Sequence, residues 1–128
     1  MNAAVRIRIT WPNGSLTARL EDTATARALL AALPVESSAS TWGEEVYFGV
    51  PVKSLLEADA RDVVDPGTVC FWVQGSSLAL PFGPTPVSRS SECRLVTRVN
   101  VLGAIEGDAR RLKTVRDGDA VKVERLQG

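Results

Sequence analysis

The feature that most constrains the fold of this chain is a series of short runs in which apolar and polar residues alternate. Each run is ended by a turn rich in glycine or proline. In the first run Val5, Ile7 and Ile9 alternate with polar residues, and the sequence Trp-Pro-Asn-Gly follows at 11–14. A period of two is typical of a strand with one solvated face, and Asn-Gly is typical of a tight turn. Because residues 16–20 alternate again, the segment 5–20 predicts a β-hairpin.

Further strands are predicted by the same reasoning, at residues 44–52, 69–73, 78–82, 95–105 and 120–126. The run 69–73 is apolar at every position, which suits a strand covered on both faces. In the run 95–105 simple alternation places Arg98 and Asn100 on one face, and Gly103 is suited to a bulge or bend. Residues 35–41 are rich in serine without periodicity and predict a loop, whereas 55–61 is ambiguous between a loop and a turn of helix.

One amphipathic helix is predicted after the hairpin. Asp22 or Thr23 can cap its start, and Pro34 ends it. A second, short helical turn is predicted within 107–115. The apolar positions of the main helix follow helical spacing at Ala26, Leu29, Leu30 and Leu33. Many short strands with one clear helix predict a mainly β protein, a closed or nearly closed barrel that occupies residues 1–128 as one domain.

The absence of histidine limits the chemistry of this chain of 128 residues. Catalysis by Ser-His-Asp or Cys-His groups is excluded, as is any metal site that needs imidazole. Cys70 lies in an apolar run, and we expect it and Cys93 to be free thiols rather than a disulfide. Neither a phosphate-binding glycine motif nor the spacing of a calcium loop occurs. We therefore expect no catalytic residue, no metal and no cofactor.

The charge balance also limits the classes of partner. Lys plus Arg and Asp plus Glu each number 15, so the formal net charge is zero and no basic face for nucleic acid is expected. No apolar run approaches the length of about 20 residues that a membrane helix needs. Apolar and charged residues alternate within residues 1–8, which do not form the apolar core of a signal peptide. We expect a cytoplasmic monomer or homodimer whose partner is neither nucleic acid nor membrane.

Several polar and aromatic residues are candidates for a site. Trp42 stands beside Gly43 after the serine-rich stretch, a position suited to the rim of a pocket, whereas core packing is the ordinary role for tryptophan. Glu45 and Tyr47 share one strand face and can form a polar wall. Arg98 points either into a pocket or into solvent, and an inward arginine needs an anionic partner.

Four segments, taken in this order, resemble one protein family. They are Trp-Gly-Glu-Glu-Val-Tyr-Phe at 42–48, Pro66-Gly67 followed by Phe71-Trp72, Phe-Gly-Pro-Thr-Pro at 82–86, and Asn100 with Gly103. The pattern resembles the small bacterial and archaeal proteins with a cyclophilin-like fold. That resemblance implies a closed barrel of about eight strands, one well-formed helix, a short second helix and a pocket. The residues we expect at the pocket are Trp42, Glu45, Tyr47, Trp72, Phe82, Thr85, Arg98 and Asn100.

The resemblance implies the fold more strongly than the activity. True prolyl isomerases of this fold use an arginine that polarises the prolyl amide, together with aromatic, glutamine and histidine groups. This chain has no histidine, and Arg98 is not in a matching motif. We therefore expect a protein that binds a small molecule or peptide. The alternatives are a weak or atypical prolyl isomerase and an interaction subunit of an amide-hydrolysing system.

Overall fold

The structure is a computed structural model that describes residues 5–126, so the part of the predicted N-terminal alternation at 1–4 lies outside it. Within the described residues there are ten strands, one α-helix and one 3₁₀ helix. In chain order they are β1 (Val5–Trp11), β2 (Gly14–Leu20), α1 (Ala24–Ala32), β3 (Val35–Ser38), β4 (Ser40–Thr41), β5 (Glu45–Gly49), β6 (Arg61–Val64), β7 (Thr68–Trp72), β8 (Ser77–Pro81), β9 (Cys93–Glu106), η1 (Ala109–Thr114) and β10 (Ala120–Arg125).

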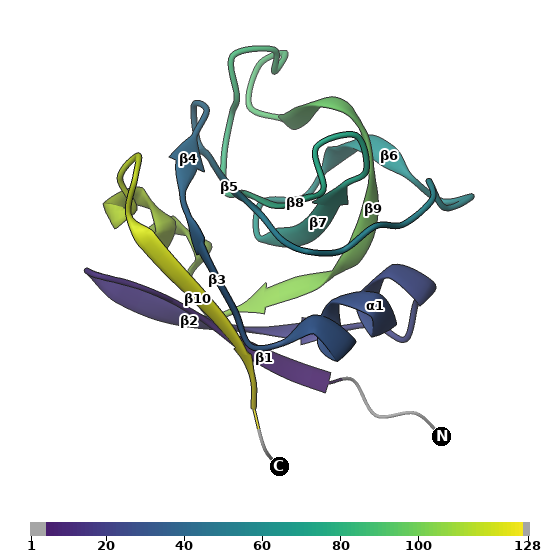
Figure 1. The fold of residues 1–128 in the computed structure, drawn as a ribbon. Helices are drawn as coiled ribbons and strands as arrows, with labels where there is room; N and C mark the ends of the chain where they lie inside the picture. The colour runs from purple at the N-terminus through teal and green to yellow at the C-terminus, as the bar shows by residue number, and fades with distance from the viewer. Residues whose placement is uncertain (1–4, 127–128) are drawn as a thin grey trace.

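Nine of these strands form one continuous path in the order β3-β10-β1-β2-β9-β7-β8-β5-β4, and β6 pairs with β9 beside that path. The two ends of the path, β3 and β4, are consecutive in the chain and separated only by Ala39. Ala39 exchanges backbone hydrogen bonds with Asp119 and Gly118, each 2.8 Å long. The chain itself therefore joins the two edges of the sheet into a nearly closed barrel (Figure 1). The predicted mainly β barrel is confirmed, with ten strands rather than about eight.

The hairpin and the helix form where the sequence predicts them. Val5 pairs with Leu20 and Trp11 with Gly14, so the register of β1 and β2 closes at the predicted turn. Thr23 caps α1 by accepting a hydrogen bond of 3.1 Å from the backbone of Ala26, which satisfies an otherwise free N–H group. Figure 1 shows α1 at the lower right of the barrel beside β1, on the side away from the long loop between β8 and β9 at the top.

Three strands were not predicted. Residues 35–41 form β3 and β4 instead of a loop, and Val35 pairs with Val123 of β10. Their serine side chains give no periodic signal, because backbone pairing with neighbouring strands rather than side-chain alternation places them in the sheet. The third, β6, begins at Arg61, the last residue of the ambiguous segment 55–61, and extends to Val64.

Strand β9 bends close to Gly103. The register against β7 shifts between Val69 and Cys70, as expected for a bulge near Gly103. Before this bulge Val99 and its neighbour Asn100 are both buried, because β9 is covered on both of its faces there. Arg98 is exposed, so Arg98 and Asn100 differ in burial although simple alternation places them on one face.

The sheet of β5, β8 and β7 is buried on both faces. One face contributes to the main core inside the barrel, with Val46 and Phe48 from β5 and Phe71 from β7. The opposite face carries a second, smaller cluster of Val64, Cys70, Ala79, Cys93, Leu95 and Val99. The run 69–73 is apolar throughout because β7 supplies both clusters in alternation, as predicted. The candidate site lies over the second cluster.

Candidate functional site

A cavity of about 250 Å³ opens beside the second cluster, on the outer face of the barrel sheet. Strand β5 contributes two side chains, β7 and β8 one each, β9 three, and the turn between β4 and β5 one. The lining residues are Trp42, Glu45, Tyr47, Trp72, Ala79, Leu95, Val96 and Val99. Val96 is 63% exposed, so this wall of the cavity reaches solvent.

The turn between β4 and β5 positions Trp42 at the edge of the cavity. The backbone of Trp42 donates to the carbonyl of Glu45 at 3.0 Å and closes a tight turn. Gly43 has a φ of +60°, and a Cβ there would lie 2.8 Å from Cδ of Pro86. A larger residue would therefore strain the backbone and displace the adjacent loop. Glu44 also donates to the carbonyl of Pro84 at 2.9 Å, which fastens the turn to that loop.

Two aromatic rings form one corner of the cavity. The centroids of Tyr47 and Trp72 are 6.3 Å apart and their planes meet at 87°, an edge-to-face arrangement that is favourable for aromatic pairs. Gly75 lies directly against the indole, because a Cβ there would clash with Cε3 of Trp72. The Trp72 ring therefore packs against both Tyr47 and the turn that follows β7.

Among the described residues that line the cavity, Glu45 is the only acidic one. It is 6% exposed, and its Oε1 has no hydrogen-bond partner within residues 5–126. Burial raises the pKa of this carboxyl from an ordinary value of 4.5 to about 7, because removal from water disfavours the charged form. Both protonation states are therefore populated near neutral pH.

The two cysteines near this site are free and buried, as predicted. Burial is the main cause of the raised pKa of Cys70, and the nearby Glu45 carboxyl raises it further. Burial likewise raises the pKa of Cys93, whose thiol donates to the carbonyl of Gly83 at 3.1 Å. A thiol that stays protonated is a poor nucleophile, so neither cysteine has the character of a reactive residue.

The cavity brings together four of the eight residues that the sequence suggested, namely Trp42, Glu45, Tyr47 and Trp72. The other four lie elsewhere. Phe82 lines a second, more polar pocket together with Lys113, and Glu45 lies on the boundary of both pockets. Thr85 is buried in the loop after β8, and Arg98 is exposed. Asn100 is fully buried and its amide bonds to α1 and to the segment after β5.

Sequence reasoning did not single out the apolar wall of the cavity. The alternation in the strand predicted at 95–105 places Leu95 and Val99 on one apolar face, and this pattern could have indicated that they line the cavity together. No sequence pattern indicated Ala79 or Val96, since an alanine in a strand and an exposed valine are both ordinary.

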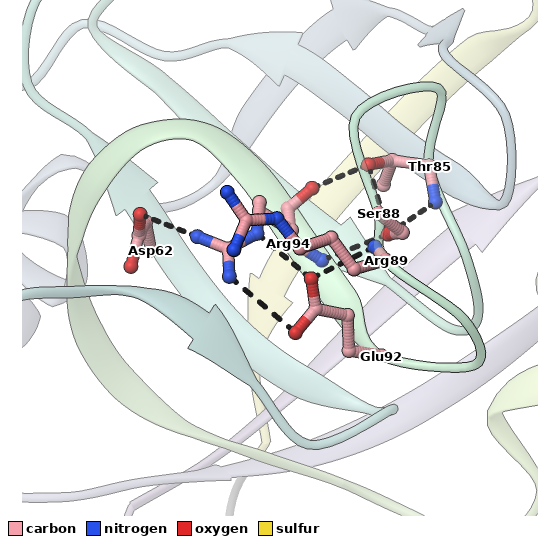
Figure 2. A network of polar contacts seen from close by, with 6 residues as sticks. All are labelled: Asp62, Thr85, Ser88, Arg89, Glu92 and Arg94. Atoms are coloured by element: carbon pink, nitrogen blue, oxygen red, sulfur yellow. Dashed lines mark hydrogen bonds and ion pairs between the residues drawn. The ribbon is translucent and has the colours of Figure 1, made fainter.

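The loop between β8 and β9 is fixed by a polar network centred on Arg94 (Figure 2). The guanidinium donates to Asp62 at 3.0 Å and to Glu92 at 2.8 Å, and so joins β6 to the start of β9. Glu92 also accepts from the backbone of Arg89 at 2.8 Å. These hydrogen bonds lower the pKa of the Glu92 carboxyl below its ordinary value, and the bond from Arg94 has the largest effect. Thr85 donates to the carbonyl of Arg94 and closes the loop.

Two kinds of site are not found in the described part of the chain. Residues 5–126 contain no group of three or more histidine, cysteine, aspartate or glutamate side chains placed to hold a metal ion. Over the same residues, neither helix has the length and apolar character needed to cross a membrane.

The barrel, its single long helix and its short 3₁₀ helix define a cyclophilin-like architecture. The sequence matches the family described as Cyclophilin-like over residues 5–124, and the chain belongs to that family. Among solved structures it is similar to the solution structure of a hypothetical protein from Archaeoglobus fulgidus. The two are 36% identical, the match covers 98% of each chain, and the TM-score is 0.84. No protein with a curated description matches the chain.

Proposed function

We propose that this protein binds a small molecule, or one side chain of a peptide, in the cavity beside Glu45. The observation that supports this most directly is the buried Oε1 of Glu45, which has no partner although it lines an otherwise apolar and aromatic cavity. Buried polar atoms in folded proteins nearly always have a partner, and a ligand would supply the missing one.

The size and lining of the cavity agree with this function. Ligand pockets are mostly apolar with a few polar groups that orient the ligand, and they usually measure roughly 300–1,000 Å³. At about 250 Å³ this cavity suits a small molecule or a single side chain rather than a large cofactor.

Prolyl isomerase activity has weaker support. In the cyclophilin-like family, isomerases need an arginine at the proline pocket, and no arginine is among the residues that line this cavity. Arg98, the nearest candidate in the sequence, is exposed. An assay on proline peptides at high protein concentration would give only the uncatalysed rate if the cavity serves binding alone.

A thermal-shift screen of metabolites and short peptides tests the binding function. A ligand at 100 times its dissociation constant stabilises the folded state by about 2.7 kcal/mol, a readily measured effect. Compounds that bind should no longer stabilise the Val96→Phe variant, because the larger side chain narrows the cavity from its exposed wall. They should still stabilise Val87→Phe, a matched change at a residue that is 43% exposed and does not line the cavity. Equal stabilisation of the two variants, or no binder at all, would refute the proposal.

A further inference from the structure

We propose, on the basis of that binding function, that the ligand carries an ammonium group on a short apolar stem. The ammonium would pair with the Glu45 carboxylate between the aromatic side chains of the cavity. The source of this group is either a free amine or the lysine side chain of a peptide.

Glu45 requires a hydrogen-bond donor, because its Oε1 is buried and unpartnered. An ionised carboxylate only accepts hydrogen bonds, and a bond from a charged donor is about twice as strong as one between neutral groups. An ammonium group supplies three donors and the opposite charge. An anionic ligand would instead place like charges together in a site of low polarity.

The charges around Glu45 leave this position open to a cation. In the turn just before β5 the adjacent Glu44 lies near Lys113 of η1, with Oε1 and Nζ 3.8 Å apart. From β7 and the start of β9 come Cys70 and Cys93, whose raised pKa values keep them neutral. Two cations lie nearby. Lys113 lines the adjoining pocket, which Glu45 also lines, but it pairs with Glu44, and Arg61 at the start of β6 acts on the neighbouring Cys70. Neither is among the described residues that line the cavity, so the carboxylate has no counter-ion inside it.

The aromatic walls favour the same ligand. The faces of tryptophan and tyrosine rings attract cations, and the effect grows when water is excluded. Trp42, Tyr47 and Trp72 all line the cavity, and the perpendicular rings of Tyr47 and Trp72 offer surfaces in two directions. The remaining wall of Ala79, Leu95 and Val99 is aliphatic and suits the stem of the ligand.

This arrangement makes binding depend on pH. The ammonium pairs only with the ionised form of the Glu45 carboxyl. The ammonium itself stays charged well above neutral pH, as the lysine side chain does, so the carboxyl alone changes its charge in this range. Because the pKa of Glu45 lies at about 7, the ionised fraction rises about tenfold between roughly pH 6 and pH 8. The affinity for an amine should rise by about the same factor over that range.

The probes for this proposal are n-butylamine, n-butanol and butyrate, which share a four-carbon stem and differ in charge. Binding is measured by the change in tryptophan fluorescence or by NMR titration at about pH 6 and pH 8. We expect butylamine to bind tightest and to gain about tenfold in affinity at the higher pH. Nα-acetyl-lysine methylamide is the fourth probe. Tighter binding than butylamine assigns the site to peptide lysine, and weaker binding assigns it to a free amine.

A matched pair of variants isolates the role of Glu45. Glu45→Gln should remove the preference for butylamine over butanol, whereas Glu44→Gln, which faces Lys113, should leave it unchanged. Melting curves of both variants establish that they fold. If butanol or butyrate binds as tightly as butylamine, the ammonium proposal fails and the binding function survives. If no probe and no compound of the wider screen binds, both proposals fail.

Discussion

Asn100 of β9 donates a hydrogen bond from Nδ2 to Oγ1 of Thr25 in α1, at 3.0 Å, inside the protein. The same amide donates to the carbonyl of Leu55 at 2.9 Å and accepts from the backbone of Glu57 at 2.7 Å. Thr25 Oγ1 also bonds to the hydroxyl of Ser54. One buried amide therefore connects the central strand, the helix and the segment between β5 and β6.

Replacing this amide should weaken the whole fold. Asn100→Ala leaves Glu57 N, the Leu55 carbonyl and the Thr25 hydroxyl with fewer partners, and an unsatisfied buried group costs about 1–3 kcal/mol. We expect a loss of about 2–4 kcal/mol in the free energy of unfolding, measured by urea denaturation. Arg98→Ala, an exposed change two residues earlier, should cost less than about 0.5 kcal/mol. Similar losses for the two variants would contradict this role for Asn100.

Asn100 also illustrates how far the sequence predicts this protein. Alternation and turn residues predict β1, β2, α1 and the barrel class, because those elements depend on local periodicity and caps. The burial of Asn100 could not be predicted, since the groups that cover it belong to Thr25, Leu55 and Glu57. Contacts between such distant segments leave no signal in the local sequence.

The candidate site could likewise be predicted only in part, where local sequence determines which residues come together. Trp42, Glu45 and Tyr47 follow one another closely in the chain, and the alternation of the strand places Glu45 and Tyr47 on one face. Trp72 reaches the same cavity because β5 and β7 both pair with β8. Phe82 was grouped with these residues through the family pattern, yet it packs against the main core. Pairing partners and the side of the sheet are tertiary properties, which a single sequence does not specify.

The stability of the protein should fall as the pH rises from about 4.5 to 7, owing to Glu45. Its folded-state pKa lies above the ordinary value, so folding favours the protonated form. The stabilising contribution is complete below the ordinary pKa of 4.5 and is lost as the pH rises through about 7. A shift of this size corresponds to at most about 3 kcal/mol.

Glu45→Gln should remove this dependence, because the amide does not ionise. The variant should be as stable as the unmodified protein near about pH 4 and more stable near about pH 8, by up to about 3 kcal/mol. Urea unfolding across this range measures the difference. The half-buried carboxylates of Glu92 and Glu106 have lowered pKa values, but they are the same in both proteins, so their effects on stability cancel in the difference. Parallel stability curves would show that the pKa of Glu45 is the same in the folded and unfolded states.

The close approach of β2 and β9 should make Gly103 intolerant of any side chain. A Cβ at Gly103 would lie 1.9 Å from the carbonyl oxygen of Arg19, which is backbone and cannot rotate away. Gly103→Ala must separate two paired strands of the barrel, and we expect a loss of more than about 3 kcal/mol or failure to fold. Gly49→Ala in β5 is the control, since nothing lies within 4 Å of its Cβ position. Denaturation midpoints that fall equally for both would contradict the steric argument.

The hydroxyl of Ser88 should hold the loop between β8 and β9 closed. Its Oγ accepts from the backbone of Thr85 at 2.9 Å and of Arg94 at 3.1 Å, and its own proton is free to bond to Thr85 Oγ1 at 3.2 Å. These bonds draw the two ends of the loop together, as Figure 2 shows. Ser88→Ala removes all three without a change of shape elsewhere.

We expect this substitution to cost about 1–2 kcal/mol and to act locally. Hydrogen exchange should become faster at the backbone amides of Thr85 and Arg94. The amides of β1 and β2 should exchange only as fast as global unfolding allows, because local opening of the loop does not require the barrel to unfold. Ser90→Ala tests a serine of the same loop for which no side-chain hydrogen bond is described, although its φ of 59° adds some backbone strain in either form. If the amide of Arg94 exchanges no faster in Ser88→Ala than in Ser90→Ala, the ion pairs of Arg94 with Asp62 and Glu92 hold the loop without the hydroxyl.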